Sequence, residues 1–160
     1  MSRLKKKKII YTAGTFDLFH VGHLNILNKA KEMGDYLIVS VSTNELVRSY
    51  KGDDPVLNYR QRASVVKSIK CVDKVVKQTK IFDIDQFNKL GADIFVIGDD
   101  WKDRYDVPGL NWLRENNKVI FLPYTKGLST TDIKRKVIKN SYEIIRSEVM
   151  RDANKKNKGV

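Results

Sequence analysis

The sequence predicts an α/β fold in which one parallel β-sheet is covered by helices on both faces. Apolar, β-rich runs alternate with helical patterns from one end of the chain to the other, and this alternation is typical of parallel sheets. The runs are apolar over most of their length, as in strands that are buried on both faces. The length of 160 residues suits one domain with a substantial core. We therefore expect a single Rossmann-like, doubly wound parallel sheet.

The first elements follow from short local patterns. Residues 9–13 (IIYTA) are expected to form a buried strand, and residues 20–33 a helix with apolar side chains at helical spacing. Gly34 is placed to end this helix. A second strand is expected at 36–42 (YLIVSVS) and a second helix at 57–70.

The alternation continues through the second half of the chain. The expected strands are 72–77, 93–98 and 118–123, and the helices between them are 82–91 and 110–116. A final long helix is expected from Ser129 towards Met150. No linker or second domain boundary stands out, so one domain is expected over 1–150, followed by a basic, disordered tail at 151–160.

Composition and charge argue against several classes of protein. The net charge of +12 indicates affinity for anions. Terminal lysine runs carry much of this excess, and the more balanced interior argues against nucleic-acid binding. No apolar run approaches the roughly 20 residues that cross a bilayer, so membrane insertion is not expected. Cys71 is the only cysteine, which makes a reducing cytoplasm the expected compartment.

Folds of this class bind ligands at the carboxyl ends of their strands. The segments that follow expected strands are 14–20, 42–51, 98–101 and 124–131. The first of them opens the stretch GTFDLFHVGH (14–23), which contains both histidines of the chain.

His20 and His23 are three residues apart, so at a helix start they project from one face. The unpaired N–H groups and the dipole of the first turn favour a phosphate there, and Gly22 leaves room for it. Other interpretations remain open. A zinc site would need ligands beyond Asp17 and a distant Cys71, a dinucleotide turn would need the missing G-x-G-x-x-G, and the histidines could have no special role.

Two further clusters lie on the same expected edge. In GLSTTDIK (127–134), Ser129 and Asp132 fit a capping box of the last helix, and the run of hydroxyls could also cradle an anion. In GDDW (98–101), Asp99 or Asp100 could bind a base or ribose, support a phosphate-bound Mg²⁺, or simply form a turn. Two anion cradles on one edge could hold the two halves of a triphosphate.

Together and in this order, these residues resemble the cytidylyltransferase family of small α/β nucleotidyltransferases. The family's H-x-G-H motif stands here as HVGH (20–23), and its R-T-x-G-I-S-T-T motif as YTKGLSTT (124–131). The supporting runs are YTAGTFDLFHVGH, GDYLIVSVSTNE, CVDKVV and VIGDDW, and the resemblance extends over 9–136. Within the family, the members that act on glycerol 3-phosphate are the most similar.

The resemblance implies an enzyme of the nucleotidyltransferase α/β phosphodiesterase type, with its catalytic domain at 1–150. It would transfer a cytidylyl group from CTP to a small phosphorylated alcohol, with glycerol 3-phosphate favoured, giving CDP-glycerol and pyrophosphate. Phosphocholine, phosphoethanolamine and other phosphorylated polyols are alternative acceptors. The resemblance also implies a homodimer, and Mg²⁺ that is held mainly by the CTP phosphates.

The resemblance implies roles for individual residues. Catalytic roles fall on His20, His23, Lys51 and Arg62, with Arg48 as a rival to Lys51. The implied nucleotide-binding residues are Thr15, Phe16, His20, Gly22, His23, Lys70, Asp100, Tyr124, Thr125, Lys126, Gly127, Leu128, Ser129, Thr130 and Thr131.

One segment departs from the family pattern. Tyr124 stands where the family has an arginine, and Lys126 where it has an acidic residue. A tyrosine supplies no positive charge to a triphosphate, so a CTP-binding protein with impaired catalysis is a second hypothesis. A nucleic-acid-binding module is a third, although the sequence shows no stacked aromatic platform.

Overall fold

The computed structural model describes residues 6–123, 125, 127 and 129–157, with residues 151–157 described by their backbone alone. The chain divides into two compact units, Met1–Lys126 and Gly127–Val160. The first unit contains the whole sheet, and the second contains one long helix.

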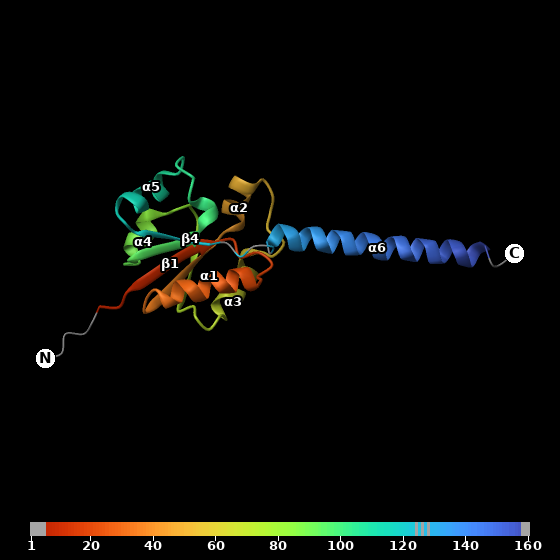
Figure 1. The fold of residues 1–160 in the computed structure, drawn as a ribbon, viewed down its shortest axis with the longest axis horizontal. Helices are drawn as coiled ribbons and strands as arrows, with labels where there is room; N and C mark the ends of the chain where they lie inside the picture. The colour runs from red at the N-terminus through yellow and green to blue at the C-terminus, as the bar shows by residue number, and fades with distance from the viewer. Residues whose placement is uncertain (1–5, 124, 126, 128, 158–160) are drawn as a thin grey trace. The chain divides into compact units, whose positions relative to one another are not determined.

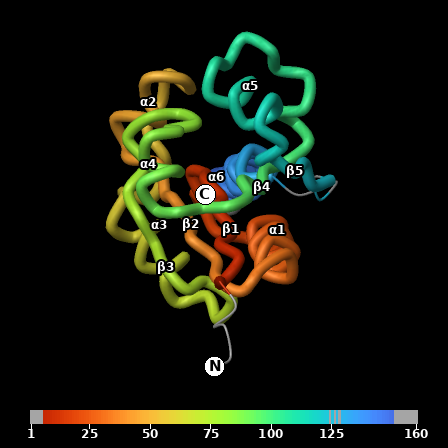
Figure 2. Tube along the Cα trace, turned by 90° about the vertical axis from the view of Figure 1, so that its left-hand side faces the viewer, coloured from red at the N-terminus to blue at the C-terminus, as the bar shows by residue number. Residues whose placement is uncertain are grey.

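A five-stranded parallel sheet forms the centre of the first unit, in the order β3-β2-β1-β4-β5. Figure 2 shows the five strands side by side in this order. The strands are β1 (Ile9–Gly14), β2 (Tyr36–Ser42), β3 (Lys74–Gln78), β4 (Ile94–Gly98) and β5 (Val119–Leu122). The strand order reverses between β1 and β4, which confirms the predicted doubly wound fold and makes the gap at their carboxyl ends the expected ligand site.

Helices cover both faces of the sheet (Figure 1). They are α1 (Val21–Glu32), α2 (Asn44–Lys51), α3 (Tyr59–Lys67), α4 (Ile84–Lys89) and α5 (Pro108–Glu115), with a 3-10 turn at Asp99–Trp101. Neighbouring strand residues face opposite ways. Ile10 packs in the core cluster that contains Leu27 of α1 and Val66 of α3, whereas Tyr11 packs in the cluster that contains Phe87 of α4.

The expected elements are confirmed with shifts of one to three residues at most ends. The structure adds α2, which lies in the segment that the sequence marked only as part of the sheet edge. Thr43 caps this helix, since its Oγ1 accepts a hydrogen bond from the Leu46 amide at 3.1 Å. Gly52 ends it in the left-handed conformation, with φ of +82°.

Gly34 follows α1 as expected, but its role is not to end the helix. The helix is capped by Met33 in a right-handed conformation. A Cβ atom on Gly34 would lie 2.6 Å from Cγ1 of Ile10 and 2.7 Å from the Lys8 carbonyl oxygen. This glycine is therefore required where the chain passes close to the start of β1.

The second unit contains α6 (Thr130–Asn157). The Asp132 amide donates to the Ser129 Oγ at 3.1 Å, and this hydroxyl in turn donates to the Asp132 carboxylate at 2.6 Å. Ser129 thus caps the last helix as the sequence predicted. The helical backbone continues through most of the segment expected as a tail. Across the described residues, no helix combines the length and the apolar character that a membrane crossing requires.

Candidate active site

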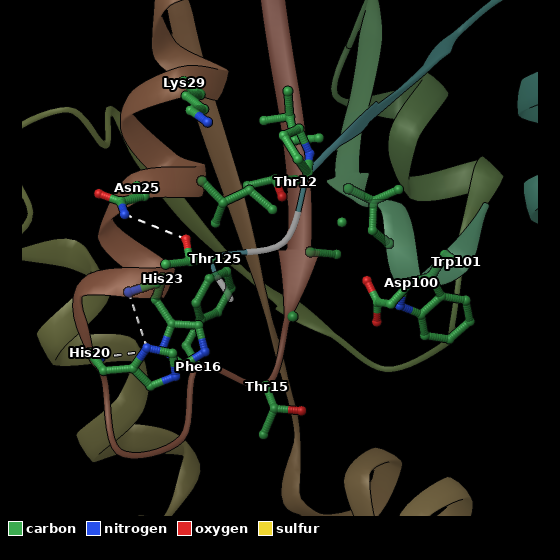
Figure 3. Close-up of a pocket in the computed structure, with 18 residues that line it drawn as sticks. Thr12, Thr15, Phe16, His20, His23, Asn25, Lys29, Asp100, Trp101 and Thr125 are labelled. Atoms are coloured by element: carbon green, nitrogen blue, oxygen red, sulfur yellow. Dashed lines mark hydrogen bonds between the residues drawn. The ribbon is translucent and has the colours of Figure 1, made fainter. Parts of the chain in front are cut away.

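A pocket opens at the carboxyl ends of β1 and β4, where the strand order reverses (Figure 3). The space between its walls amounts to about 850 Å³, which includes open solvent at its mouth. The lining residues come from β1 and its loop, α1, β4 and its 3-10 turn, and the end of β5. They are Thr12, Ala13, Gly14, Thr15, Phe16, His20, Gly22, His23, Asn25, Ile26, Lys29, Ile97, Gly98, Asp100, Trp101, Leu122, Pro123 and Thr125.

The loop from β1 to α1 is tightly folded. Phe16 and Leu18 adopt positive φ angles of 53° and 45°, which most side chains avoid. The Phe16 ring is nevertheless 4% exposed and packs against Phe19 and His23, with ring centroids 6.5 and 5.4 Å away. A Cβ on Gly14 would lie 3.2 Å from this ring. The glycine therefore lets Phe16 fold back over its own loop.

Two buried charged residues hold this loop in place. The Asp17 carboxylate accepts hydrogen bonds from the amides of Val56 and Leu57 at 2.9 and 3.0 Å. The Arg62 guanidinium donates to the carbonyl oxygens of Thr15 and Leu57 at 2.6 and 2.9 Å, and to Oδ1 of Asn44 at 2.8 Å.

Arg62 is 0% exposed and does not line the pocket. Burial lowers the pKa of its guanidinium, and the Asp17 carboxylate acts in the opposite direction. The sequence placed this residue among the catalytic groups. In the structure its donors are used to join the β1 loop to α2 and to the chain that leads into α3.

The two histidines form a reciprocal cap at the start of α1. His20 Nδ1 accepts from the Gly22 amide at 3.1 Å, and His23 Nδ1 accepts from the His20 amide at 3.4 Å. Their rings stack with centroids 3.9 Å apart. Because each Nδ1 is an acceptor, a neutral ring carries its proton on Nε2. The amides of His20 and Gly22 are therefore occupied, and the rings rather than these amides are available to a phosphate.

Electrostatics keep both rings neutral near pH 7. Burial lowers the pKa of His20, and burial with help from His20 and Lys51 lowers the pKa of His23 to about 4. His20 Nε2 is buried and has no hydrogen-bond partner among the described residues. An unpartnered buried donor is costly, so a ligand oxygen that reached His20 Nε2–H would relieve this cost.

Acidification should weaken the folded state in the pH range where histidines titrate. The His23 pKa of about 4 lies below the ordinary value of 6.5, so between these values the unfolded chain binds a proton that the folded chain does not. We expect the free energy of unfolding to fall as the pH is lowered from about 6.5 to about 4.5. Urea denaturation at several pH values would measure this fall. It should be smaller in His23→Gln, and an equal fall in both proteins would contradict the assignment.

The opposite wall of the pocket combines a carboxylate and an aromatic ring. Asp100 and Trp101 follow β4 in the 3-10 turn. Desolvation raises the pKa of Asp100, and the neighbouring Asp99 raises it further. The Trp101 ring packs edge-on against Phe82 at 5.0 Å, and the Arg104 guanidinium lies 5.4 Å from it. A base, a ribose or a phosphate-bound cation would each find a suitable group on this wall.

The polar pocket residues that the sequence missed include Asn25 and Lys29. Both lie on α1 beyond the histidines (Figure 3), and Asn25 Nδ2 donates to Thr125 Oγ1 at 3.4 Å. Residues 22, 25 and 29 recur at helical spacing. Following the helix face that contains Gly22 along the predicted helix would therefore have identified Asn25 and Lys29 as pocket residues.

Comparison with known proteins decides the family. A family model described as cytidylyltransferase-like matches residues 11–136, which is most of the chain. The chain belongs to the cytidylyltransferase-like family. The nucleotidyltransferase class that the sequence predicted is thereby confirmed.

Named family relatives match over most of their length. A glycerol-3-phosphate cytidylyltransferase of Bacillus spizizenii is 44% identical over 133 residues, covering 81% of this chain and 95% of the relative. One of Staphylococcus aureus is 39% identical over 134 residues, with 81% and 95% covered. Among solved structures, a lipopolysaccharide core biosynthesis protein of Thermoplasma volcanium has a TM-score of 0.61 at 22% identity, covering 75% of this chain and 98% of that one. This last likeness supports the fold alone.

The structure brings together only part of the site expected for a cytidylyltransferase. Expected residues that line the pocket are Thr15, Phe16, His20, Gly22, His23, Asp100 and Thr125. Lys51 and Lys70 are exposed and do not line it. Gly127 and Ser129–Thr131 belong to the second unit, and Tyr124, Lys126 and Leu128 lie outside the described residues.

Proposed function

We propose that this chain transfers the cytidylyl group of CTP to glycerol 3-phosphate, giving CDP-glycerol and pyrophosphate. Membership of the cytidylyltransferase-like family supports the reaction class, and the names of the relatives at 39–44% identity support the acceptor. The observation that carries the chemistry is the histidine pair, whose neutral rings line the pocket and hold their protons on Nε2.

The proposed reaction is a single in-line displacement. An oxygen of the glycerol 3-phosphate phosphate attacks the α-phosphorus of CTP. The bond between the α-phosphorus and the oxygen that bridges to the β-phosphate breaks, and pyrophosphate leaves with its electron pair. No covalent enzyme intermediate is needed. His20 and His23 would donate Nε2–H hydrogen bonds to the phosphate oxygens on which charge develops, and such donors contribute most when they are fixed in advance.

Mg²⁺ is the proposed metal, held mainly by the phosphates of CTP. Within the described part of the chain, no cluster of three or more His, Cys, Asp or Glu side chains could hold a metal ion. Asp100 is the one carboxylate among the described residues of the pocket lining. A single carboxylate fits an ion whose other ligands are phosphate oxygens and water. When bound, the ion would supply charge neutralisation on the phosphates, and Asp100 would hold it.

The other parts of the proposed site stay as the sequence suggested. On the family resemblance, Gly127–Thr131 and Lys51 are also proposed to bind the phosphates of CTP. Lys70 and Lys126 would add positive charge near the phosphates, whereas Tyr124 supplies none where the family has an arginine. Arg62 would act by fixing the loop that carries Thr15 and Phe16, because each of its three guanidinium nitrogens already donates a hydrogen bond within the protein. We also propose a cytoplasmic homodimer as the working form.

A panel assay tests the proposal. The protein is incubated with CTP, Mg²⁺ and, in turn, glycerol 3-phosphate, phosphocholine and phosphoethanolamine, and pyrophosphate release is measured. Release with glycerol 3-phosphate well above the other acceptors is expected. Preference for another acceptor would overturn the substrate assignment. Tight CTP binding without release from any acceptor would favour the catalytically impaired alternative that Tyr124 raises.

A further inference from the structure

We infer that Asn25 and Lys29 read the base of the nucleotide and select cytosine over uracil. The inference deepens the proposed function and rests on it for the identity of the nucleotide. Neither residue belongs to the two motifs by which the chain resembles its family. Both line the pocket from α1, on the same side as the histidines (Figure 3).

Their position along α1 fits the length of a nucleotide. Lys29 comes nine residues after His20, which corresponds to about 13 Å along the helix axis. With its phosphates at the histidine pair, a nucleotide that extends along this helix directs its ribose and base towards Asn25 and Lys29. Lys29 is thus placed at the end of the pocket away from the phosphate donors.

The two side chains complement the hydrogen-bonding edge of cytosine. Because Asn25 Nδ2 donates to Thr125 Oγ1 at 3.4 Å, its Oδ1 is left as an acceptor. Lys29 offers only donors. Cytosine presents an N4 amino donor beside its N3 acceptor, so Asn25 receives N4–H and Lys29 donates to N3, whereas O2 is an acceptor in both bases and does not distinguish them. Uracil places an acceptor at O4 and a donor at N3, which leaves both side chains mismatched.

The mismatch is costly mainly at Asn25, which is half-buried, whereas Lys29 is exposed. The pocket lining also includes Ala13, Ile26, Leu122 and Pro123, and an unpaired polar group in such a site is penalised. Among the pocket-lining residues that the structure describes, Lys29 is the only Lys or Arg. With both histidines neutral, its charge is the one fixed positive charge of this lining.

Equilibrium binding separates base recognition from phosphate recognition. Dissociation constants for CTP and UTP would be measured by calorimetry on the wild type, Lys29→Met and Asn25→Leu. We expect the wild type to prefer CTP, and each variant to lower this preference at least about tenfold, the range for a lost specific polar contact. Lys89→Met, which removes an exposed lysine of α4 outside the pocket, is the charge-matched control and should keep the preference.

The possible results differ in what they overturn. Equal losses for CTP and UTP in Lys29→Met would show that Lys29 contacts phosphate or ribose, and an unchanged ratio in both variants would also overturn the inference. A wild-type protein that binds CTP and UTP equally would overturn the inference as well. If the wild type prefers CTP but releases no pyrophosphate with any acceptor, the proposed function fails while the base assignment stands.

Discussion

Replacing His23 by alanine should lower turnover at least about a hundredfold, which is the cost of losing one preorganised transition-state donor. His23 lines the pocket, and because its Nδ1 accepts a hydrogen bond from the His20 amide, its proton is fixed on Nε2. The loss should fall mainly on kcat, because the charge that this donor stabilises develops in the transition state. The measurement is steady-state pyrophosphate release with CTP and glycerol 3-phosphate, together with the dissociation constant for CTP.

A control on the same helix separates catalysis from folding. Val21 is 54% exposed and does not line the pocket, so Val21→Ala should retain near-normal turnover. Thermal unfolding of the two variants would establish that both are folded at the assay temperature. A folded His23→Ala protein with kcat within about threefold of the wild type would remove His23 from the mechanism.

Truncating Arg62 should have the largest effect on stability. Arg62→Ala removes a fully buried side chain and leaves the carbonyl oxygens of Thr15 and Leu57 and the Asn44 Oδ1 without their donor. We expect a loss of about 3–5 kcal/mol in the free energy of unfolding, the range for emptying the site of a large buried side chain with its hydrogen bonds. Urea denaturation measures it directly.

Arg60 provides the matched control for this prediction. It lies two residues earlier on α3 and is exposed, so Arg60→Ala should change the free energy of unfolding by no more than about 0.5 kcal/mol. Asn44→Ala should fall between the two, since it removes one of the three acceptors of Arg62. A similar small loss in all three variants would contradict the structural role of Arg62.

The sheet was predictable because its strands are continuous apolar runs, and burial on both faces makes such runs distinctive. Strand β2 (Tyr36–Ser42) was predicted with its exact bounds. Helix α2 was missed, because its sequence NELVRSYK is short and polar and only Val47 is buried. Its start depends on the Thr43 cap, a local signal that the apolar pattern does not contain.

The positions of His20 and His23 in the site were predictable, because their motif closely follows the first predicted strand. The sequence could not show that their Nδ1 atoms cap α1, because several residue types can serve a helix start. Arg62 was expected near the phosphates on the family resemblance alone. Only the structure shows that its guanidinium is buried against the loop between β1 and α1. Asn25 and Lys29 became visible once β1, α1 and β5 were placed around one pocket.

If this protein transfers a cytidylyl group from CTP to glycerol 3-phosphate, the products of the reaction will show it. Wild-type protein would be incubated with CTP, Mg²⁺ and glycerol 3-phosphate, and the nucleotide products identified by ³¹P NMR and mass. We expect CDP-glycerol and pyrophosphate in equal amounts, each matching the CTP consumed. Consumption of CTP without a CDP-alcohol, or no consumption by a folded protein that binds CTP, would contradict it.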